Sequence, residues 1–144
     1  MHGTPITMPP GHIQALMKPM AASLSMPREW VELMAQAASF SRFDPGQVLQ
    51  VEGDPAEAMY IVLRGRVKVF RTATTGREQV MHVAGPGDHV NLVPLIDGGR
   101  CPASLQALIE VDTLVCTVEA FGALLAREPR LALIMMKDLA RRQR

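Results

Sequence analysis

Short apolar runs separated by glycine turns occupy the middle of this 144-residue chain, and no other feature constrains its fold as strongly. Each run has the length of one β-strand, and each gap has the composition of a turn. The runs are Val48 to Val51, Met59 to Leu63, Val67 to Phe70 and Gln79 to Val83. Strands spaced this regularly predict an antiparallel sandwich or barrel, closed by Leu105 to Leu108 and Thr113 to Val118.

Glycine marks the points where such a sheet must reverse direction, because glycine reaches a positive φ without a steric penalty from Cβ. We therefore interpret the glycines of these turns as structural residues that take a positive φ: Gly46, Gly53, Gly65, Gly76, Gly85 and Gly87. On this interpretation they report a fold and carry no chemistry of their own.

Helices are expected on both sides of the strand region. Pro27 suits the first turn of a helix, whose apolar face would be Trp30, Leu33, Met34 and Ala37 and whose exit would be Pro45-Gly46. Residues 1–26 are interrupted by prolines and predict a mobile or loosely docked arm with at most one helical turn, His12 to Met17.

The end of the chain is expected to be helical again. One helix is predicted over Glu119 to Arg127, and Pro129 opens another. The last helix carries an apolar stripe of Leu131, Ile134, Met135 and Leu139. This stripe would either begin a two-helix dimer seam or pack against the protein's own roll. The predicted division is an arm over residues 1–26, a roll with its N-terminal helix over 27–128, and the start of a dimerisation-type helix over 129–144.

Composition excludes several classes of function. With 15 Lys and Arg against 14 Asp and Glu, the net charge is +1, which excludes a strongly basic nucleic-acid footprint over the whole chain. The cysteines, Cys101 and Cys116, are too few for a disulfide framework, a four-thiolate zinc site or an all-cysteine iron–sulfur cluster. The sequence has no signal-peptide pattern and no apolar run of membrane-spanning length, so we expect a soluble, cytoplasmic protein.

Several motifs occur in a characteristic order: Phe43-Asp44-Pro45-Gly46, Val51-Glu52-Gly53-Asp54, Arg64-Gly65-Arg66-Val67, Gly76-Arg77-Glu78 and Gly85-Pro86-Gly87-Asp88. In this respect the chain resembles the cyclic-nucleotide-binding domain of the catabolite-activator and fumarate-nitrate-regulator (Crp/Fnr) superfamily, from about Leu24 to the chain end. The resemblance implies a mainly β fold, a double-stranded β-helix jelly roll, with an N-terminal helix and a C-terminal helix pair.

The resemblance also implies a phosphate-binding cassette after Gly87. In the family it opens with a Gly-Glu pair, whose glutamate binds the ribose, and closes with an arginine that neutralises the cyclic phosphate. Here Val90-Asn91 stands where Gly-Glu is expected, and Cys101 stands where the arginine is expected. Asn91 lacks a charge and Cys101 offers no cation, so we expect a degenerate site that forms a smaller and more apolar cavity.

The residues predicted to line this cavity are Val90, Asn91, Leu92, Val93, Arg100, Cys101, Pro102, Ala103 and Ser104. Arg100 would restore an anion site if its loop turned inward. Cyclic AMP and cyclic GMP are therefore not the expected effectors.

The same segment also carries residues that haem binding or redox chemistry would need. Some members of this superfamily bind haem, which needs an axial His, Cys or Met, and His82 and His89 flank the cassette turn. Cys101 is expected to be a buried, inert thiol, and it would be a redox thiol beside Arg100 only if the pair were partly exposed. Cys116 fits a core position. A cupin enzyme would need a His-x-His pair, which the sequence lacks. No enzyme, cofactor or metal site is predicted.

The sequence thus predicts the effector-sensing domain of a Crp/Fnr-like transcription regulator, in which a small molecule bound in the roll biases a dimer helix. DNA would be bound only through a C-terminal helix-turn-helix domain, for which no residues remain before Arg144. The alternatives are a stand-alone module that acts through a protein partner and a haem-based gas sensor domain. No membrane partner is expected.

Overall fold

The computed structural model describes residues 3–7, 12, 15 and 26–143. Its strands are β1 (Thr4–Pro5), β2 (Ser39–Phe43), β3 (Val48–Gln50), β4 (Ala58–Arg64), β5 (Val67–Thr72), β6 (Glu78–Ala84), β7 (His89–Val90), β8 (Ser104–Ala107) and β9 (Val111–Thr117). Its helices are α2 (Arg28–Ala37), α3 (Leu92–Asp97), α4 (Val118–Arg127) and α5 (Arg130–Arg142). Each strand expected from the sequence is present, and β1, β2 and β7 are additional.

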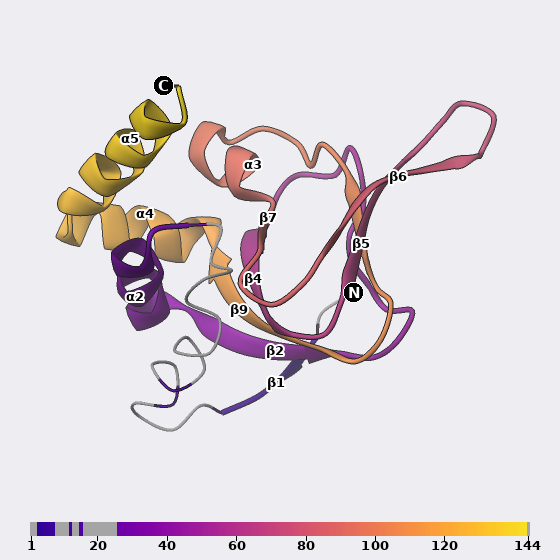
Figure 1. Ribbon diagram of the computed structural model, residues 1–144, viewed down its shortest axis with the longest axis horizontal. Helices are drawn as coiled ribbons and strands as arrows, with labels where there is room; N and C mark the ends of the chain where they lie inside the picture. Colours follow the sequence, from indigo (N-terminus) through magenta and orange to yellow (C-terminus); the bar gives the residue numbers. More distant parts are fainter. Residues whose placement is uncertain (1–2, 8–11, 13–14, 16–25, 144) are drawn as a thin grey trace.

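The strands form two antiparallel sheets, with α2, α4 and α5 gathered at one end of the molecule (Figure 1). The larger sheet has the order β1-β2-β9-β4-β7 and the smaller sheet the order β3-β8-β5-β6. This arrangement confirms the predicted jelly roll, with one helix before it and a helix pair after it. Among the described helices, none combines the length and the apolar composition that crossing a membrane requires.

The larger sheet is covered on both faces, which explains why β4 reads as an almost continuous apolar run. Met59, Ile61 and Leu63 belong to the cluster packed under the helices, whereas Tyr60 and Val62 face the interior of the roll. We call these two groups the helix-side core and the roll core. Burial on both faces leaves β4 no solvent-exposed side before Arg64.

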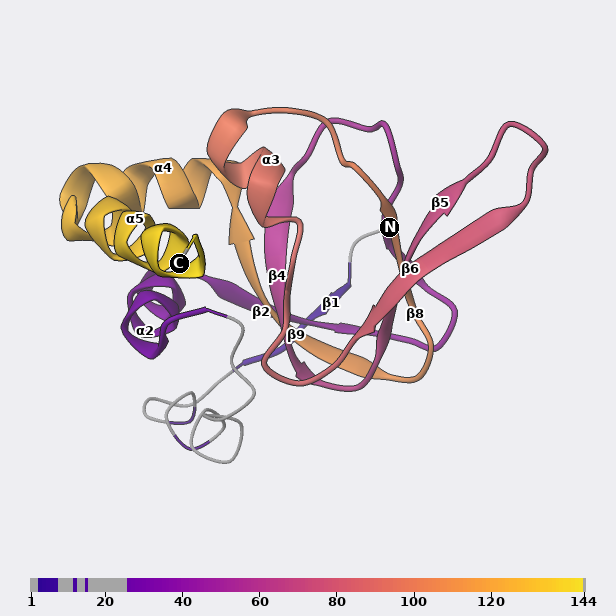
Figure 2. The same ribbon diagram turned by 45° about the horizontal axis from the view of Figure 1, so that its top comes forward.

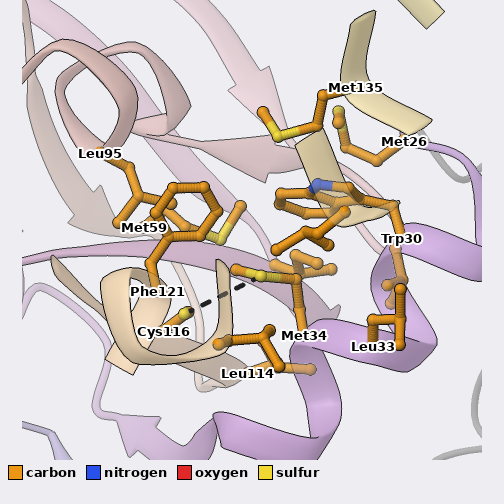
Figure 3. Close-up of a cluster of buried hydrophobic side chains, with 14 of the residues drawn as sticks. Met26, Trp30, Leu33, Met34, Met59, Leu95, Leu114, Cys116, Phe121 and Met135 are labelled. Atoms are coloured by element: carbon orange, nitrogen blue, oxygen red, sulfur yellow. Dashed lines mark hydrogen bonds between the residues drawn. The ribbon is translucent and has the colours of Figure 1, made fainter. Parts of the chain in front are cut away.

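The helix-side core confirms the apolar face predicted for the first helix. Trp30, Leu33 and Met34 are buried there, and the indole of Trp30 lies beside Met26 and Met135 (Figure 3). Cys116 is fully buried in the same cluster, with its thiol 4.0 Å from the Met34 sulfur. Cys116 is therefore a core residue, as predicted.

The exit of the first helix was predicted wrongly. The helix ends at Ala37 and not at Pro45-Gly46, because residues 39–43 form β2 and pair with β9. The alternation of this segment explains the change of structure: Phe40 packs on the helix-side core, whereas Phe43 is buried in the roll core.

Gly65 is the turn position that most clearly requires glycine. Its φ is 103°, and a Cβ there would lie 2.4 Å from the carbonyl oxygen of Glu110. The positive φ predicted for Gly46, Gly53, Gly76 and Gly87 is confirmed. Gly85 differs, because its φ is not positive. It instead makes room for Arg66, whose Nη1 would lie 2.8 Å from an added Cβ.

The predicted N-terminal arm falls mostly outside the described residues. Within it, Thr4 and Pro5 form β1, opposite Arg42 and Ser41 of β2, and the amide of Ile6 donates to the Phe40 carbonyl at 3.0 Å. This part of the arm is therefore an edge strand of the larger sheet. The predicted mobility of the rest and the proposed helical turn stay predictions.

Candidate ligand-binding site

A cavity of about 460 Å³ lies between the β5–β6 strands and the cassette segment. Its volume is typical of small-molecule sites. One wall consists of the predicted cassette residues Val90, Asn91, Leu92 and Val93, with Pro94, Pro102 and Ala103. The cavity therefore forms where the sequence predicts it, and six of the nine predicted residues line it.

The remaining predicted residues lie elsewhere. Arg100 is exposed and donates from Nη1 to the Gly53 carbonyl at 2.9 Å, so its guanidinium does not line the cavity. Cys101 is buried and its thiol accepts a hydrogen bond from Gln50 Nε2 at 2.9 Å. The hydroxyl of Ser104 accepts from the backbone amide of Glu52. These three residues tie the cassette to the β3–β4 loop.

The redox hypothesis for Cys101 is wrong. The side chain is 2% exposed, and burial raises the pKa of its thiol above the ordinary value, an effect that the hydrogen bonds from Asn91 and Gln50 oppose. A reactive cysteine needs an accessible thiolate. Burial likewise raises the pKa of Cys116, to about 11.

The backbone at the start of α3 corrects the placement of the Gly-Glu pair. Asn91 has φ 70° and ψ 30°, a left-handed conformation that glycine adopts most easily. Asn91, and not Val90, thus occupies the glycine position, and Leu92 follows it where the glutamate would stand. The side-chain amide of Asn91 already has a partner within the protein, because its Nδ2 donates to the Ala58 carbonyl at 2.8 Å.

The opposite wall was not predicted from the sequence. It consists of Val69 and Arg71 of β5 and Met81 and His82 of β6, with His89, Leu105 and Leu139 at other points of the lining. The pairing of β5 with β6 shifts between Val69–His82 and Phe70–Val80, which leaves Met81 as an extra residue. Such a bulge re-aims side chains, so both Met81 and His82 reach the cavity. No local sequence pattern predicts a bulge of this kind.

Charge around the cavity is one-sided. Arg71 and the two histidines line it, whereas no aspartate or glutamate does so among the residues that the structure describes. The closest carboxylate partner of Arg71 is Glu52, with Nε and Oε2 at 3.5 Å, and Glu52 Oε1 accepts from the Thr72 amide. The other lining residues are apolar except for Asn91.

A second cavity, of about 370 Å³, has the opposite character. Asp54, Glu57, Tyr60 and Gln50 are among its lining residues, and β1 contributes Pro5. Burial, with a smaller contribution from Glu57, raises the pKa of Tyr60 to about 12. The Cys101 thiol contacts one lining residue of each cavity, because it accepts from Gln50 Nε2 of the smaller cavity and from Asn91 Nδ2 of the larger one.

Metal binding has no support in the described part of the chain, where no three His, Cys, Asp or Glu side chains are grouped to hold an ion. His82 and His89, which the sequence offers as haem ligands, both line the larger cavity.

The C-terminal stripe is divided between two environments. Leu131 and Met135 are buried in the helix-side core, and Ile134 packs against it. Leu139 is 56% exposed and also lines the cavity. Most of the predicted dimer stripe thus packs against the protein itself, because α5 lies on α2 and α4 (Figure 2).

Comparison with curated proteins finds CRP-like regulators among those similar to this chain. It is 30% identical over 102 residues to the "CRP-like cAMP-activated global transcriptional regulator" of Mycobacterium tuberculosis, covering 71% of this chain and 46% of that protein. It is 33% identical over 102 residues to the "Cyclic AMP receptor protein" of Thermus thermophilus, covering 71% and 47%. The chain thus spans about half the length of these relatives. Fungal lysophospholipases also match, such as NTE1 of Phaeosphaeria nodorum at 28% identity, over 81% of this chain but 7% of that protein.

Solved structures agree with these relatives. The N-terminal domain of a transcriptional regulator from Streptomyces coelicolor matches with a TM-score of 0.72 and 30% identity, over 89% of this chain and 88% of that one. The catabolite activator protein of Thermus thermophilus matches with a TM-score of 0.69 and 29% identity, over 89% and 57%. The family model described as "Cyclic nucleotide-binding domain" covers residues 40–128, which hold both sheets except β1 and part of β2. The chain therefore belongs to the cyclic nucleotide-binding domain family and is similar to the corresponding part of CRP-like transcription regulators.

Proposed function

We propose that this chain is the effector-sensing domain of a Crp/Fnr-like transcription regulator and that its cassette no longer binds a cyclic nucleotide. The observation that carries the proposal is the chemistry of the cassette wall. Leu92 follows the left-handed Asn91, and Pro102 lines the closing turn, so neither a carboxylate nor a guanidinium of the cassette faces the cavity. A buried phosphate is strongly disfavoured without a cation beside it. The cassette wall supplies no cation, and Arg71, the permanently charged residue of the lining, stands on the opposite wall.

Calorimetric titration with cyclic AMP and cyclic GMP tests this proposal directly. We expect no saturable heat up to millimolar nucleotide, whereas the Thermus thermophilus cyclic AMP receptor protein, titrated with cyclic AMP, serves as the positive control. Saturable micromolar binding by this chain would overturn the proposal and would mean that another group supplies the anion site.

A gain-of-function variant sharpens the test. The triple substitution Asn91→Gly, Leu92→Glu and Cys101→Arg restores the residue types that the family resemblance implies. We expect it to acquire cyclic-nucleotide binding. The matched control carries Asn91→Gly, Leu92→Gln and Cys101→Gln, which change polarity in the same places without adding charge, and it should not bind cyclic nucleotide. Equal behaviour of the two triples would exclude the cassette charges as the missing element.

Signal transmission is proposed to run through α5 into a homodimer. Leu139 touches both the cavity and the outer surface of α5, so a ligand that contacts Leu139 can bias the position of this helix. Leu133, Met136 and Leu139 are exposed and are the residues that we assign to a dimer seam, in place of Leu131 and Met135. Sedimentation of the wild type and of Met136→Glu tests this assignment, since the charge should shift a dimer toward monomer.

Regulation of DNA is proposed to require the part of the relatives' length that this chain does not match. The chain alone should not shift a promoter fragment selectively.

We propose a cytoplasmic location and no catalytic activity. The matches to fungal lysophospholipases support the idea that this domain also occurs inside enzymes as a separate unit. Action through a protein partner as a stand-alone module is the alternative.

A haem-based sensor is the second candidate function, favoured by the presence of His82 and His89 on one cavity. Titration with ferric haem, followed by absorbance, tests it. A shift of the Soret band that is lost in each of the single variants His82→Ala and His89→Ala would support a bis-histidine site. We expect only the spectrum of free haem.

A further inference from the structure

We propose that the larger cavity binds an amphipathic organic acid, that is, a molecule with an apolar body and a single carboxylate, and that the carboxylate is recognised by Arg71. This inference rests on the proposed function of the same cavity as an effector site. It adds the chemical class of the effector and the residue that selects it, neither of which follows from membership of the family.

The walls of the cavity select an apolar body. Val69, Met81, Leu92, Pro102 and Leu105 come from four separate segments of the chain and converge on the space. A ribose or a sugar phosphate would leave its hydroxyl groups facing these side chains without hydrogen bonds, which is costly. Hydrocarbon or an aromatic ring, by contrast, gains free energy from burial against them.

The charged rim selects the anion. Arg71 is the residue of the lining that carries a permanent charge, and it lies on β5 beside the bulge that brings Met81 and His82 to the cavity. Its side chain is 54% exposed, so the guanidinium can meet a carboxylate at the mouth without full desolvation of either group. A planar carboxylate matches the donor fork of arginine.

Glu52 holds this arginine in place without neutralising it by a hydrogen bond. The closest approach of the two groups, 3.5 Å from Nε to Oε2, is longer than a good charge-assisted hydrogen bond. Glu52 is itself anchored, since Oε1 accepts from the Thr72 amide at 3.0 Å. A ligand carboxylate therefore competes with a weak ion pair, and removal of the Glu52 charge should strengthen ligand binding.

Decanoate is a suitable probe, with decanol as its uncharged analogue and both titrated into the purified chain. We expect saturable binding of decanoate and binding of decanol weaker by about ten-fold, the effect of one hydrogen-bonded charge. Arg71→Gln should weaken decanoate by a similar factor and leave decanol unchanged. Arg77→Gln removes the same charge from the same hairpin outside the cavity and is the matched control. Glu52→Gln should strengthen the binding of decanoate, since the glutamine side chain still accepts from the Thr72 amide.

Methionine methyl resonances locate the bound probe. Met81 lines the cavity, whereas Met59 is fully buried in the helix-side core on the far face of the larger sheet. Decanoate should shift the Met81 signal and leave Met59 unchanged. This readout is independent of charge and also shows that Arg71→Gln is folded.

The possible outcomes separate the two proposals. This inference is overturned if Arg71→Gln binds decanoate with the affinity of the wild type, or if bound decanoate does not shift the Met81 methyl resonance. If neither decanoate nor cyclic AMP binds, this inference is also overturned, but the proposal that the cassette no longer binds a cyclic nucleotide stands. Displacement of decanoate by micromolar cyclic AMP overturns the proposed function itself.

Discussion

Asn91 holds a left-handed backbone conformation that few residues other than glycine adopt. It has φ 70° and is the non-glycine residue with a positive φ in the described part of the chain. The hydrogen bond from its Nδ2 to the Ala58 carbonyl stabilises this geometry at the start of α3. Asparagine is among the few residues that tolerate the left-handed region. The start of α3 therefore reaches a left-handed backbone conformation without a glycine.

A pair of variants isolates the cost of this conformation. Asn91→Ala and Asn91→Gly both lose the amide, but only alanine keeps the steric penalty of Cβ at positive φ. We expect the glycine variant to be more stable by about 1 kcal/mol. Urea unfolding of both variants measures the difference, and equal midpoints would mean that the backbone relaxes out of the left-handed region.

Asp112 is the most heavily paired carboxylate of the described residues. Arg42 binds both of its oxygens, at 2.7 and 3.2 Å, and Arg64 Nε donates to Oδ2 at 3.0 Å. The hydrogen bond from Arg42, opposed by burial and aided by Arg64, lowers the pKa of Asp112 below its ordinary value. These contacts join β2, β4 and β9 at one end of the larger sheet.

The pH dependence of stability follows from the direction of that shift. A carboxylate with a lowered folded pKa contributes stability above its unfolded pKa, near 4, and loses it as pH falls through the folded value. We expect Asp112→Asn to reduce the free energy of unfolding by about 1–2 kcal/mol at neutral pH, allowing for the exposed arginines. The difference from wild type should shrink below about pH 4. A difference that is constant with pH would assign the effect to packing.

At the residue scale, the sequence predicted which segment forms the cavity but not which side chains enter it. Val90 to Val93 line the cavity as predicted, whereas Arg100 and Cys101 face the β3–β4 loop. Segment and turn chemistry are local properties. The direction of a side chain in an irregular loop depends on partners such as Gly53 and Gln50, about 50 residues away in sequence.

At the scale of elements, α5 shows how packing decides the role of an apolar stripe. Leu131 is fully buried, whereas Leu133, two residues further on the same helix, is 50% exposed. Amphipathic periodicity predicted the helix correctly, but it could not say whether the apolar face meets this chain or a second one. Likewise, the sequence prediction missed β2, because the alternation of Ser39–Phe43 extends over only 5 residues and identifies a strand only once the partner β9 is known.

Two leucines test this division. Leu131→Ala should cost about 2–5 kcal/mol of stability, because it removes a buried side chain from the helix-side core. Leu133→Ala on the exposed side should cost less than about 0.5 kcal/mol. Thermal or urea unfolding compares the two under conditions where the protein is monomeric. Similar losses would mean that Leu133 is buried in the monomer, which would contradict its exposed position on α5.

At the scale of the whole molecule, the two thiols report on its two cores. Cys116 lies in the helix-side core and Cys101 adjoins the roll, and both are buried with raised pKa values. We expect neither thiol to react with a disulfide reagent in the native protein near pH 8. Because β4 contributes to both cores, both should become reactive at one urea midpoint. Earlier labelling of Cys101 would show that the roll opens as a separate unit.

The pairing of β2 with β9 has a consequence for how the chain reaches this structure. Arg42 and Asp112 are 70 residues apart in sequence, and Ser41 and Thr113 are 72 apart, so the larger sheet closes only after almost the whole chain is available. Local units such as the β5–β6 hairpin form in microseconds, whereas closure over such separations takes milliseconds to seconds. On a ribosome, β2 would wait with an unpaired edge until β9 emerged, and this interval is when the chain is most exposed to aggregation.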